Sequence, residues 1–146
     1  MQSRRRLFVV ALLGGLLSAG ATGQTPQKSA DGAPPLAAGQ GRIYFYRTST
    51  RAPLVRPAVK LNGEAVGSAE PKAAFFVDRA PGDYEIEASS GEKKLRLSLA
   101  AGEVMFVRLK VTFGVIGGSV VPELVSRETG RSEMKALAPA SPGAKP

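Results

Sequence analysis

Apolar and polar residues alternate with a period of two through most of the chain between Arg42 and Leu137. This period places the apolar side chains on one face of a β-strand, whereas an amphipathic helix would repeat about every 3.6 residues. The alternation is clearest where Leu95, Leu97 and Leu99 are separated by polar residues. We predict strands at residues 42–47, 58–61, 64–68, 73–78, 83–89, 93–99, 104–112 and 119–126, a short strand or turn at 133–137, and no amphipathic helix.

Turn residues separate the predicted strands. Asn62-Gly63 has the two residue types that tolerate the positive φ of a two-residue hairpin turn. Pro81-Gly82 fits the central positions of a type II turn, and Pro122 marks its strand as an edge strand or the site of a bulge. About seven to eight short strands with this spacing predict an all-β fold, a small antiparallel sandwich of the Ig-like or prealbumin-like kind.

The first residues have the order of a secretory signal peptide. Residues 4–6 are arginines, residues 7–17 are apolar apart from two glycines, and small residues follow. The Ala-Gly-Ala sequence at 19–21 predicts cleavage after residue 21, with cleavage after residue 23 as the alternative. A retained membrane anchor and a twin-arginine signal are the rival interpretations, and the apolar run is short for a membrane span. We predict that residues 1–23 are a signal peptide.

The segments that flank the predicted strands are poor in residues that could order them. Residues 24–41 and 138–146 are rich in Pro, Gly, Ala and polar residues, so we predict a disordered linker, a folded domain at 42–137 and a disordered tail. The chain has no Cys, which excludes disulfides and a lipid-modified N-terminal Cys. We expect a periplasmic or secreted protein that is neither a lipoprotein nor transmembrane after cleavage.

Five short motifs, in their order and spacing, resemble the DUF2846 family of bacterial envelope proteins. The motifs are IYFYR at 43–47, VKLNGEAVG at 59–67, FFVDRAPGDYEI at 75–86, AGEVMFVR at 101–108 and PELV at 122–125. The resemblance covers residues 41–137 and implies a small, exported, sandwich-like β domain with no established activity. Family members often carry a lipid anchor, whereas this chain lacks the Cys for one. The turn regions also resemble PEGA-type surface domains, which points to scaffolding or binding.

The residue types needed for much enzyme chemistry are missing. The chain has no His and no Cys, which excludes Ser-His-Asp and Cys-His arrangements and the usual zinc sites. We therefore expect no enzyme activity, no cofactor and no metal. The alternative is a carboxylate-dependent hydrolase that uses Asp78 and Asp83, which flank the turn at 79–82. The interpretation we prefer is that both carboxylates fix this turn by accepting backbone hydrogen bonds.

Arg42, Arg47, Arg51, Arg56 and Lys60 form a basic run without an acidic residue. Such a run is typical of a solvated strand face and loop, where cations discourage pairing at a sheet edge. The alternative is a surface that contacts anionic groups through Arg47, Arg51 and Arg56. Nucleic acid is not an expected partner, because the chain is predicted to be exported.

Residues 113–121, FGVIGGSVV, are apolar and rich in glycine. They predict either a tight bend between buried strands or an exposed apolar loop that binds a partner through Val115 and Ile116. The function we predict is a non-catalytic, exported domain that binds or scaffolds an envelope protein, lipid or polysaccharide. The alternative is a module that binds carbohydrate or peptide through the loops at 49–56 and 114–118.

Overall fold

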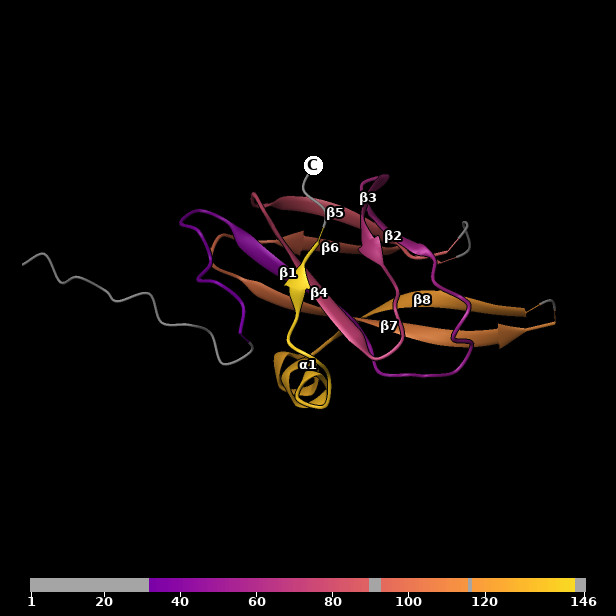
Figure 1. Cartoon of the computed structure of the whole chain (residues 1–146). Coiled ribbons are helices and arrows are strands. Elements are labelled where there is room, and N and C mark those ends of the chain that lie inside the picture. The colour runs from indigo at the N-terminus through magenta and orange to yellow at the C-terminus, as the bar shows by residue number, and fades with distance from the viewer. Residues whose placement is uncertain (1–31, 90–92, 116, 144–146) are drawn as a thin grey trace, which may run out of the picture.

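The computed structural model of this chain describes residues 32–89, 93–115 and 117–143. In these residues nine strands form two sheets, and one short helix follows the eighth strand. The elements are β1 (Gly41–Arg47), β2 (Ala58–Leu61), β3 (Glu64–Ser68), β4 (Ala73–Arg79), β5 (Gly82–Glu87), β6 (Leu95–Leu99), β7 (Val104–Gly114), β8 (Gly117–Val125), α1 (Arg127–Met134) and β9 (Ser141–Pro142). The sheets pack face to face, with α1 against the larger one (Figure 1). The predicted all-β sandwich is confirmed.

The larger sheet has the strand order β8-β7-β1-β4-β9, and the smaller sheet has the order β3-β2-β5-β6. The larger sheet is mixed rather than antiparallel, because β1 pairs in parallel with β7 and β4 pairs in parallel with β9. Pro122 lies in β8 at the edge of this sheet, opposite Leu109, which confirms the edge position predicted for its strand.

Two hydrophobic clusters hold these layers together. The first fills the space between the sheets and includes Ile43 and Phe45 of β1. The second lies on the outer face of the larger sheet, under α1, and includes Tyr44 and Tyr46 of the same strand. The central strand β1 is therefore buried along its whole length, which explains why its sequence carries large aromatic residues on both faces.

The helix α1 corrects the prediction of no helix. Of the segment predicted as a strand or turn, residues 133–134 end α1 and residues 135–136 form a turn. Ser126 caps the first turn of α1 by accepting a hydrogen bond from the Thr129 backbone N–H (3.1 Å). The only buried residue of α1 is Gly130, at which a Cβ atom would lie 2.4 Å from Cγ of Phe106. The helix approaches the sheet closely at this glycine, and Met134 packs against the second cluster. Its sequence therefore has no apolar stripe that periodicity could reveal.

The two predicted turns differ in outcome. Asn62 and Gly63 have φ values of 50° and 85°, which confirms the hairpin turn between β2 and β3. Gly82 begins β5 without the positive φ that a type II turn requires at its position, so the prediction for Pro81-Gly82 is wrong. The chain bends at Pro81 and passes there from the larger sheet to the smaller one.

Parts of the predicted linker and tail contribute contacts to the fold. Ala33 is buried in the second cluster, and the Pro34 carbonyl accepts a hydrogen bond from Arg42 (2.8 Å). The tail adds β9 to the edge of β4, where the Gly143 N–H donates to the Phe76 carbonyl (2.7 Å). The predicted signal peptide, linker residues 24–31 and tail residues 144–146 lie outside the described residues.

Every described strand, the helix and both clusters fall between residues 33 and 142. A chain that begins at Thr22 therefore contains all of the described fold. Within the described ranges, no helix has the length and apolar character needed to cross a membrane.

Candidate functional site

Arg47, at the end of β1, is fully buried, with 0% of its surface exposed. Its terminal nitrogens donate hydrogen bonds to four backbone carbonyls. These are the carbonyls of Val55 (2.6 Å), Ala69 (2.9 Å), Ala52 (3.0 Å) and Arg51. Burial is the largest influence on this side chain and lowers the pKa of Arg47. The prediction that Arg47 contacts a ligand on an exposed face is wrong, because its strand lies at the centre of a sheet covered on both sides.

The four hydrogen bonds give Arg47 a structural role in the loop between β1 and β2. Three of the accepting carbonyls belong to residues 51–55, and the fourth belongs to Ala69, after β3. The loop also carries a turn of its own, in which the Val55 N–H donates to the Ala52 carbonyl (3.0 Å). Arg47 thus holds one loop conformation from inside the protein. Val55 of that loop packs against the core, whereas Arg51, Leu54 and Arg56 are exposed.

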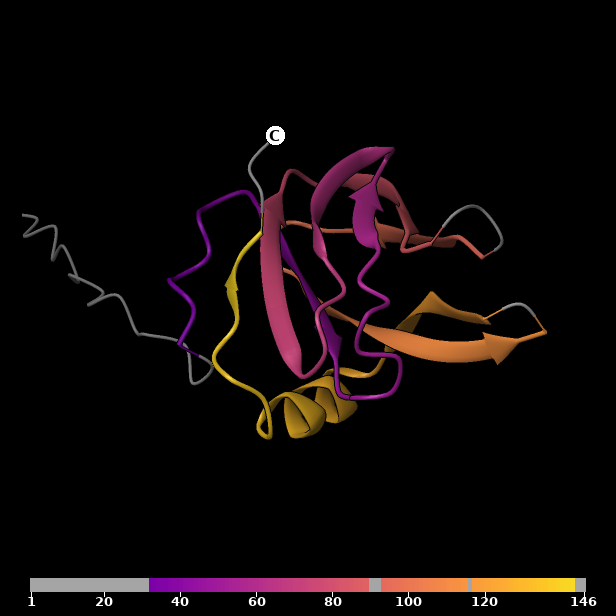
Figure 2. The same ribbon diagram turned by 45° about the vertical axis from the view of Figure 1, so that its right-hand side comes forward.

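This loop lies beside the end of the β7–β8 hairpin. A Cβ atom built on Gly118 would lie 3.6 Å from Cβ of Ala52 and 3.5 Å from the ring of Phe113. In two views the loop before β2 runs next to the hairpin, which extends away from the sandwich (Figures 1 and 2). The loops predicted at 49–56 and 114–118 are therefore brought together at one end of the molecule.

Three large apolar side chains are exposed at this end. Leu54 is 92% exposed and Phe113 61% exposed, and Val115 is fully exposed. We call these three residues the hairpin-end patch. Sequence reasoning singled out Val115 but not Leu54, whose position between two prolines gave no periodic signal. The other predicted contact residue, Ile116, lies outside the described residues.

The surroundings of the hairpin-end patch are positively charged. Arg51 is exposed in the loop that carries Leu54, and Lys110 is exposed on β7. Arg56 is exposed as well and pairs with Glu70 (3.0 Å). Residues 42–60 and 104–122 contain no acidic residue. Of the predicted basic contact residues, Arg51 and Arg56 thus lie at the surface near the patch.

The two candidate catalytic carboxylates lie on opposite outer faces of the sandwich. Asp78 accepts two hydrogen bonds from Arg42 (2.6 and 2.7 Å), whose guanidinium stacks over Phe76 in the second cluster. Asp83 accepts a hydrogen bond from the Ser98 hydroxyl on the smaller sheet. The structure does not bring them together, and Asp78 serves as the partner of a buried arginine rather than as a turn-fixing group.

The burial of Arg42 also corrects the prediction of a solvated basic strand face. Only 2% of its surface is exposed, and hydrogen bonding to Asp78 raises the pKa of Arg42. Like Arg47, it lies on the central strand, where a cation must find partners inside the protein. The two arginines have different partners. Arg42 pairs with the carboxylate of Asp78, whereas Arg47 donates hydrogen bonds to backbone carbonyls.

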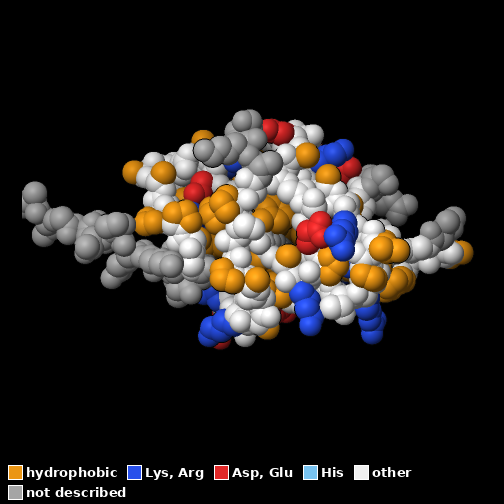
Figure 3. Space-filling model, in the orientation of Figure 1, with side chains coloured by type: hydrophobic (Ala, Val, Ile, Leu, Met, Phe, Trp, Pro, Cys, Tyr) orange, Lys and Arg blue, Asp and Glu red, His pale blue; other side chains and the backbone are white. Residues whose placement is uncertain are grey.

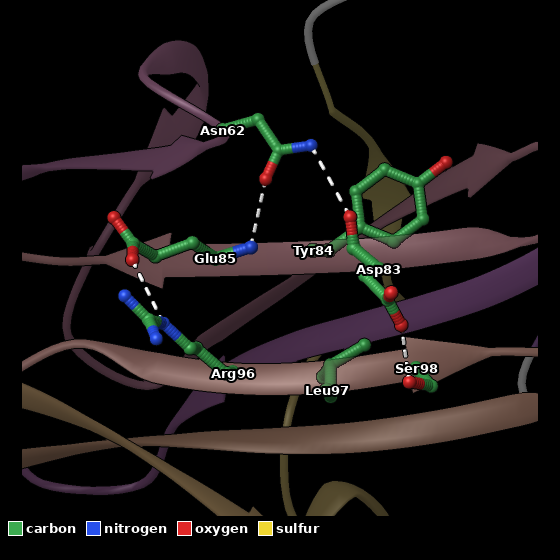
Figure 4. Close-up of a pocket in the computed structure, with 7 residues that line it drawn as sticks. All are labelled: Asn62, Asp83, Tyr84, Glu85, Arg96, Leu97 and Ser98. Carbon is green, nitrogen blue, oxygen red and sulfur yellow. Dashed lines mark hydrogen bonds and ion pairs between the residues drawn. The ribbon is translucent and has the colours of Figure 1, made fainter.

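An open depression on the smaller sheet is a second candidate site. Its lining residues are Asn62, Asp83, Tyr84, Glu85, Arg96, Leu97 and Ser98 (Figure 4). The Asn62 side chain accepts a hydrogen bond from the Glu85 N–H (2.8 Å), and the Glu85 carboxylate pairs with Lys94 (2.6 Å) and Arg96 (3.1 Å). Lys94 and then Arg96 lower the pKa of Glu85. These side chains form hydrogen bonds and ion pairs with one another across neighbouring strands, as cross-strand pairs that stabilise a sheet surface commonly do.

A polar network joins α1 to the larger sheet. Glu133 of α1 accepts hydrogen bonds from the Tyr46 hydroxyl (2.6 Å) and from Arg108 (2.6 Å), which also pairs with Glu123 (2.9 Å). Burial, and then the hydrogen bond to Glu133, raises the pKa of Tyr46. The described ranges hold no group of three or more acidic side chains that could bind a metal ion. The network ties α1 to β1 and β7, and Arg108 extends it to β8.

Comparison with known proteins identifies the family. Residues 37–120 match the model of a family described as "Protein of unknown function (DUF2846)". The chain belongs to the DUF2846 family. The match confirms the resemblance over residues 41–120, which include the loop with Leu54 and the end of the β7–β8 hairpin, whereas the PELV motif at 122–125 lies beyond it. The helix α1 and β9 lie beyond this DUF2846 match. No curated protein and no solved structure matched the chain.

Proposed function

We propose that this DUF2846 protein is a non-catalytic, exported β-sandwich that binds or scaffolds a component of the cell envelope through the hairpin-end patch. The observation that carries the proposal is the exposure of Leu54, Phe113 and Val115 at one end of the molecule. Apolar side chains gathered on a surface favour association, because contact with a partner removes them from water.

The way the patch is built supports a binding role. Leu54 belongs to a loop whose carbonyls are held by the buried Arg47, and Phe113 and Val115 end a paired hairpin. A surface held in one conformation loses little conformational freedom when a partner binds, which favours affinity. The separation of Asp78 from Asp83 speaks against the hydrolase alternative, because paired carboxylate chemistry needs both groups at one site.

A carbohydrate- or peptide-binding module is the second candidate. It is favoured by the same juxtaposition of the 49–56 loop with the hairpin end, where the exposed ring of Phe113 offers a stacking surface. A soluble oligosaccharide or peptide that competes with envelope binding would support this candidate over a scaffolding role.

The test of the proposed function is binding to an envelope fraction of the producing bacterium by a chain that begins at Thr22. We expect Val115→Asp and Leu54→Asp to abolish most of the binding. Leu124→Asp is the matched control, because Leu124 is a partly exposed leucine of β8 outside the hairpin-end patch. Circular dichroism would verify that each variant is folded. Undiminished binding by both folded patch variants would refute the proposal.

Export is tested separately by cell fractionation and N-terminal sequencing of the full chain. We expect a periplasmic or secreted product that begins at Thr22 or Gln24. A product that stays in the cytoplasm with residue 1 intact would refute the exported location.

A further inference from the structure

The hairpin-end patch protrudes from the molecule rather than lining a hollow. The β7–β8 hairpin extends past the smaller sheet (Figure 2). Val115 directly follows the last residue of β7. In the space-filling view, hydrophobic side chains gather over this end of the molecule (Figure 3). A protruding apolar end fits a deformable partner that it can enter, whereas a small ligand is usually bound in a concave site.

Positive charge lies around this protruding end. Arg51 directly precedes Ala52, whose Cβ lies beside Gly118. Lys110 is exposed on β7 three residues before Phe113, on the opposite face of the strand. Lys or Arg side chains border the hydrophobic side chains in the space-filling view (Figure 3). The Glu70 carboxylate nearby is already paired with Arg56. The partner therefore meets an apolar tip with cations beside it, and this charge is complementary to an anionic surface.

We infer that the hairpin-end patch docks on an anionic lipid surface, an inference that rests on the proposed function and names its partner. Phe113, Val115 and Leu54 would enter the boundary between headgroups and acyl chains, and Arg51 and Lys110 would lie among the lipid phosphates. Proteins that bind at the membrane interface combine these same two contributions, buried apolar area and attraction of basic residues to anionic lipid.

The experiment is co-sedimentation of the chain that begins at Thr22 with vesicles. One set contains phosphatidylglycerol and phosphatidylethanolamine, and the other contains phosphatidylcholine alone. We expect binding to the anionic vesicles that weakens with added salt, and little binding to the neutral ones. Val115→Asp should weaken binding about tenfold or more, because an apolar side chain is lost and a negative charge is added. Arg51→Gln should weaken it about fivefold.

Two matched variants control for unspecific effects. Leu124→Asp makes the same apolar-to-acidic change outside the patch, and Lys135→Gln removes an exposed positive charge after α1. Both should bind anionic vesicles as the unmodified chain does.

Equal binding to neutral and anionic vesicles, or unchanged binding by folded Val115→Asp and Arg51→Gln variants, would overturn the inference. Capture of an envelope protein that depends on Val115, together with no binding to anionic vesicles, would overturn the lipid inference and leave the proposed function standing. Envelope binding that none of the patch variants alters would overturn both.

Discussion

Replacing Arg47 by methionine tests whether a buried cation holds the loop that carries Leu54. The substitution keeps a long, unbranched side chain and removes every donor from the site. Arg47 makes four hydrogen bonds to carbonyls, and a hydrogen bond from a charged donor contributes about 1.5–3 kcal/mol. Methionine avoids the cost of keeping a cation away from water, which is several kcal/mol.

The hydrogen bonds outweigh the relief from that cost. The Ala69 carbonyl is the most buried of the four acceptors and would lose its Arg47 donor. The carbonyls of the 51–55 loop can turn to water, but only if the loop leaves its present position. We therefore expect Arg47→Met to lower the free energy of unfolding by about 3 kcal/mol.

Urea denaturation measures this loss, and hydrogen exchange at the Val55 amide reports on the loop. This amide donates to the Ala52 carbonyl within the loop that Arg47 holds, so its exchange should accelerate in the variant. Lys60→Met is the control, because Lys60 is an exposed cation of β2 and its replacement should change stability by no more than about 0.5 kcal/mol. The reasoning is refuted if Arg47→Met is as stable as the control and leaves Val55 exchange unchanged.

Two further predictions concern the contact between α1 and the larger sheet. Gly130→Ala should destabilise the protein by about 1–3 kcal/mol in thermal or urea unfolding, because the added methyl meets Cβ and Cγ of Phe106. Helix propensity alone would instead make the variant more stable, and such a gain would contradict this prediction. Ser132→Ala, at an exposed position of α1, is the control. The folded-state pKa of Tyr46 is raised, so above about pH 10 this side chain ionises in the unfolded chain before it does in the folded protein, and stability falls as the pH rises. Tyr46→Phe should reduce this loss of stability. Parallel profiles of unfolding free energy against pH for the variant and the unmodified protein would contradict the prediction.

The alternation of apolar and polar residues was sufficient to predict those strands that have one face in the core and one face in solvent. The strands at 58–61 and 64–68 have the predicted bounds, and the left-handed conformation of Asn62 and Gly63 follows from their residue types. Leu97 and Leu99 are buried on the predicted face of β6. Period-two alternation describes such strands completely, because their environment alternates in the same way.

Long-range pairing could not be predicted in this way. Arg42 and Arg47 look like solvated residues in the sequence, because basic side chains are seldom fully buried. They are buried because β1 is central and covered on both faces, which depends on β7 and α1 far along the chain. The partner of Arg42 is a carboxylate on β4, and the partners of Arg47 are backbone carbonyls. Backbone acceptors cannot be recognised from the residue types in a sequence.

The candidate site was predicted in part for the same reason. The apolar run at 113–121 drew attention to Val115, since it is unusual in composition. The contribution of Leu54 depends on the contact between Ala52 and Gly118, which joins segments that are distant in the sequence. A hairpin end and a loop become one surface only when the larger sheet has formed.

The central position of β1 has a consequence for how the chain acquires its structure. Tyr44 of β1 pairs with Phe76 of β4 on one side and with Phe106 of β7 on the other. The first strand of the sheet to be synthesised therefore pairs with strands from the middle and the later part of the chain. Contacts of such sequence separation slow folding, because a long loop must close before any of them forms. A chain delivered from its N-terminus would therefore leave at least one edge of its most aromatic segment unpaired until β7 arrives, which makes this period the time of greatest exposure to aggregation.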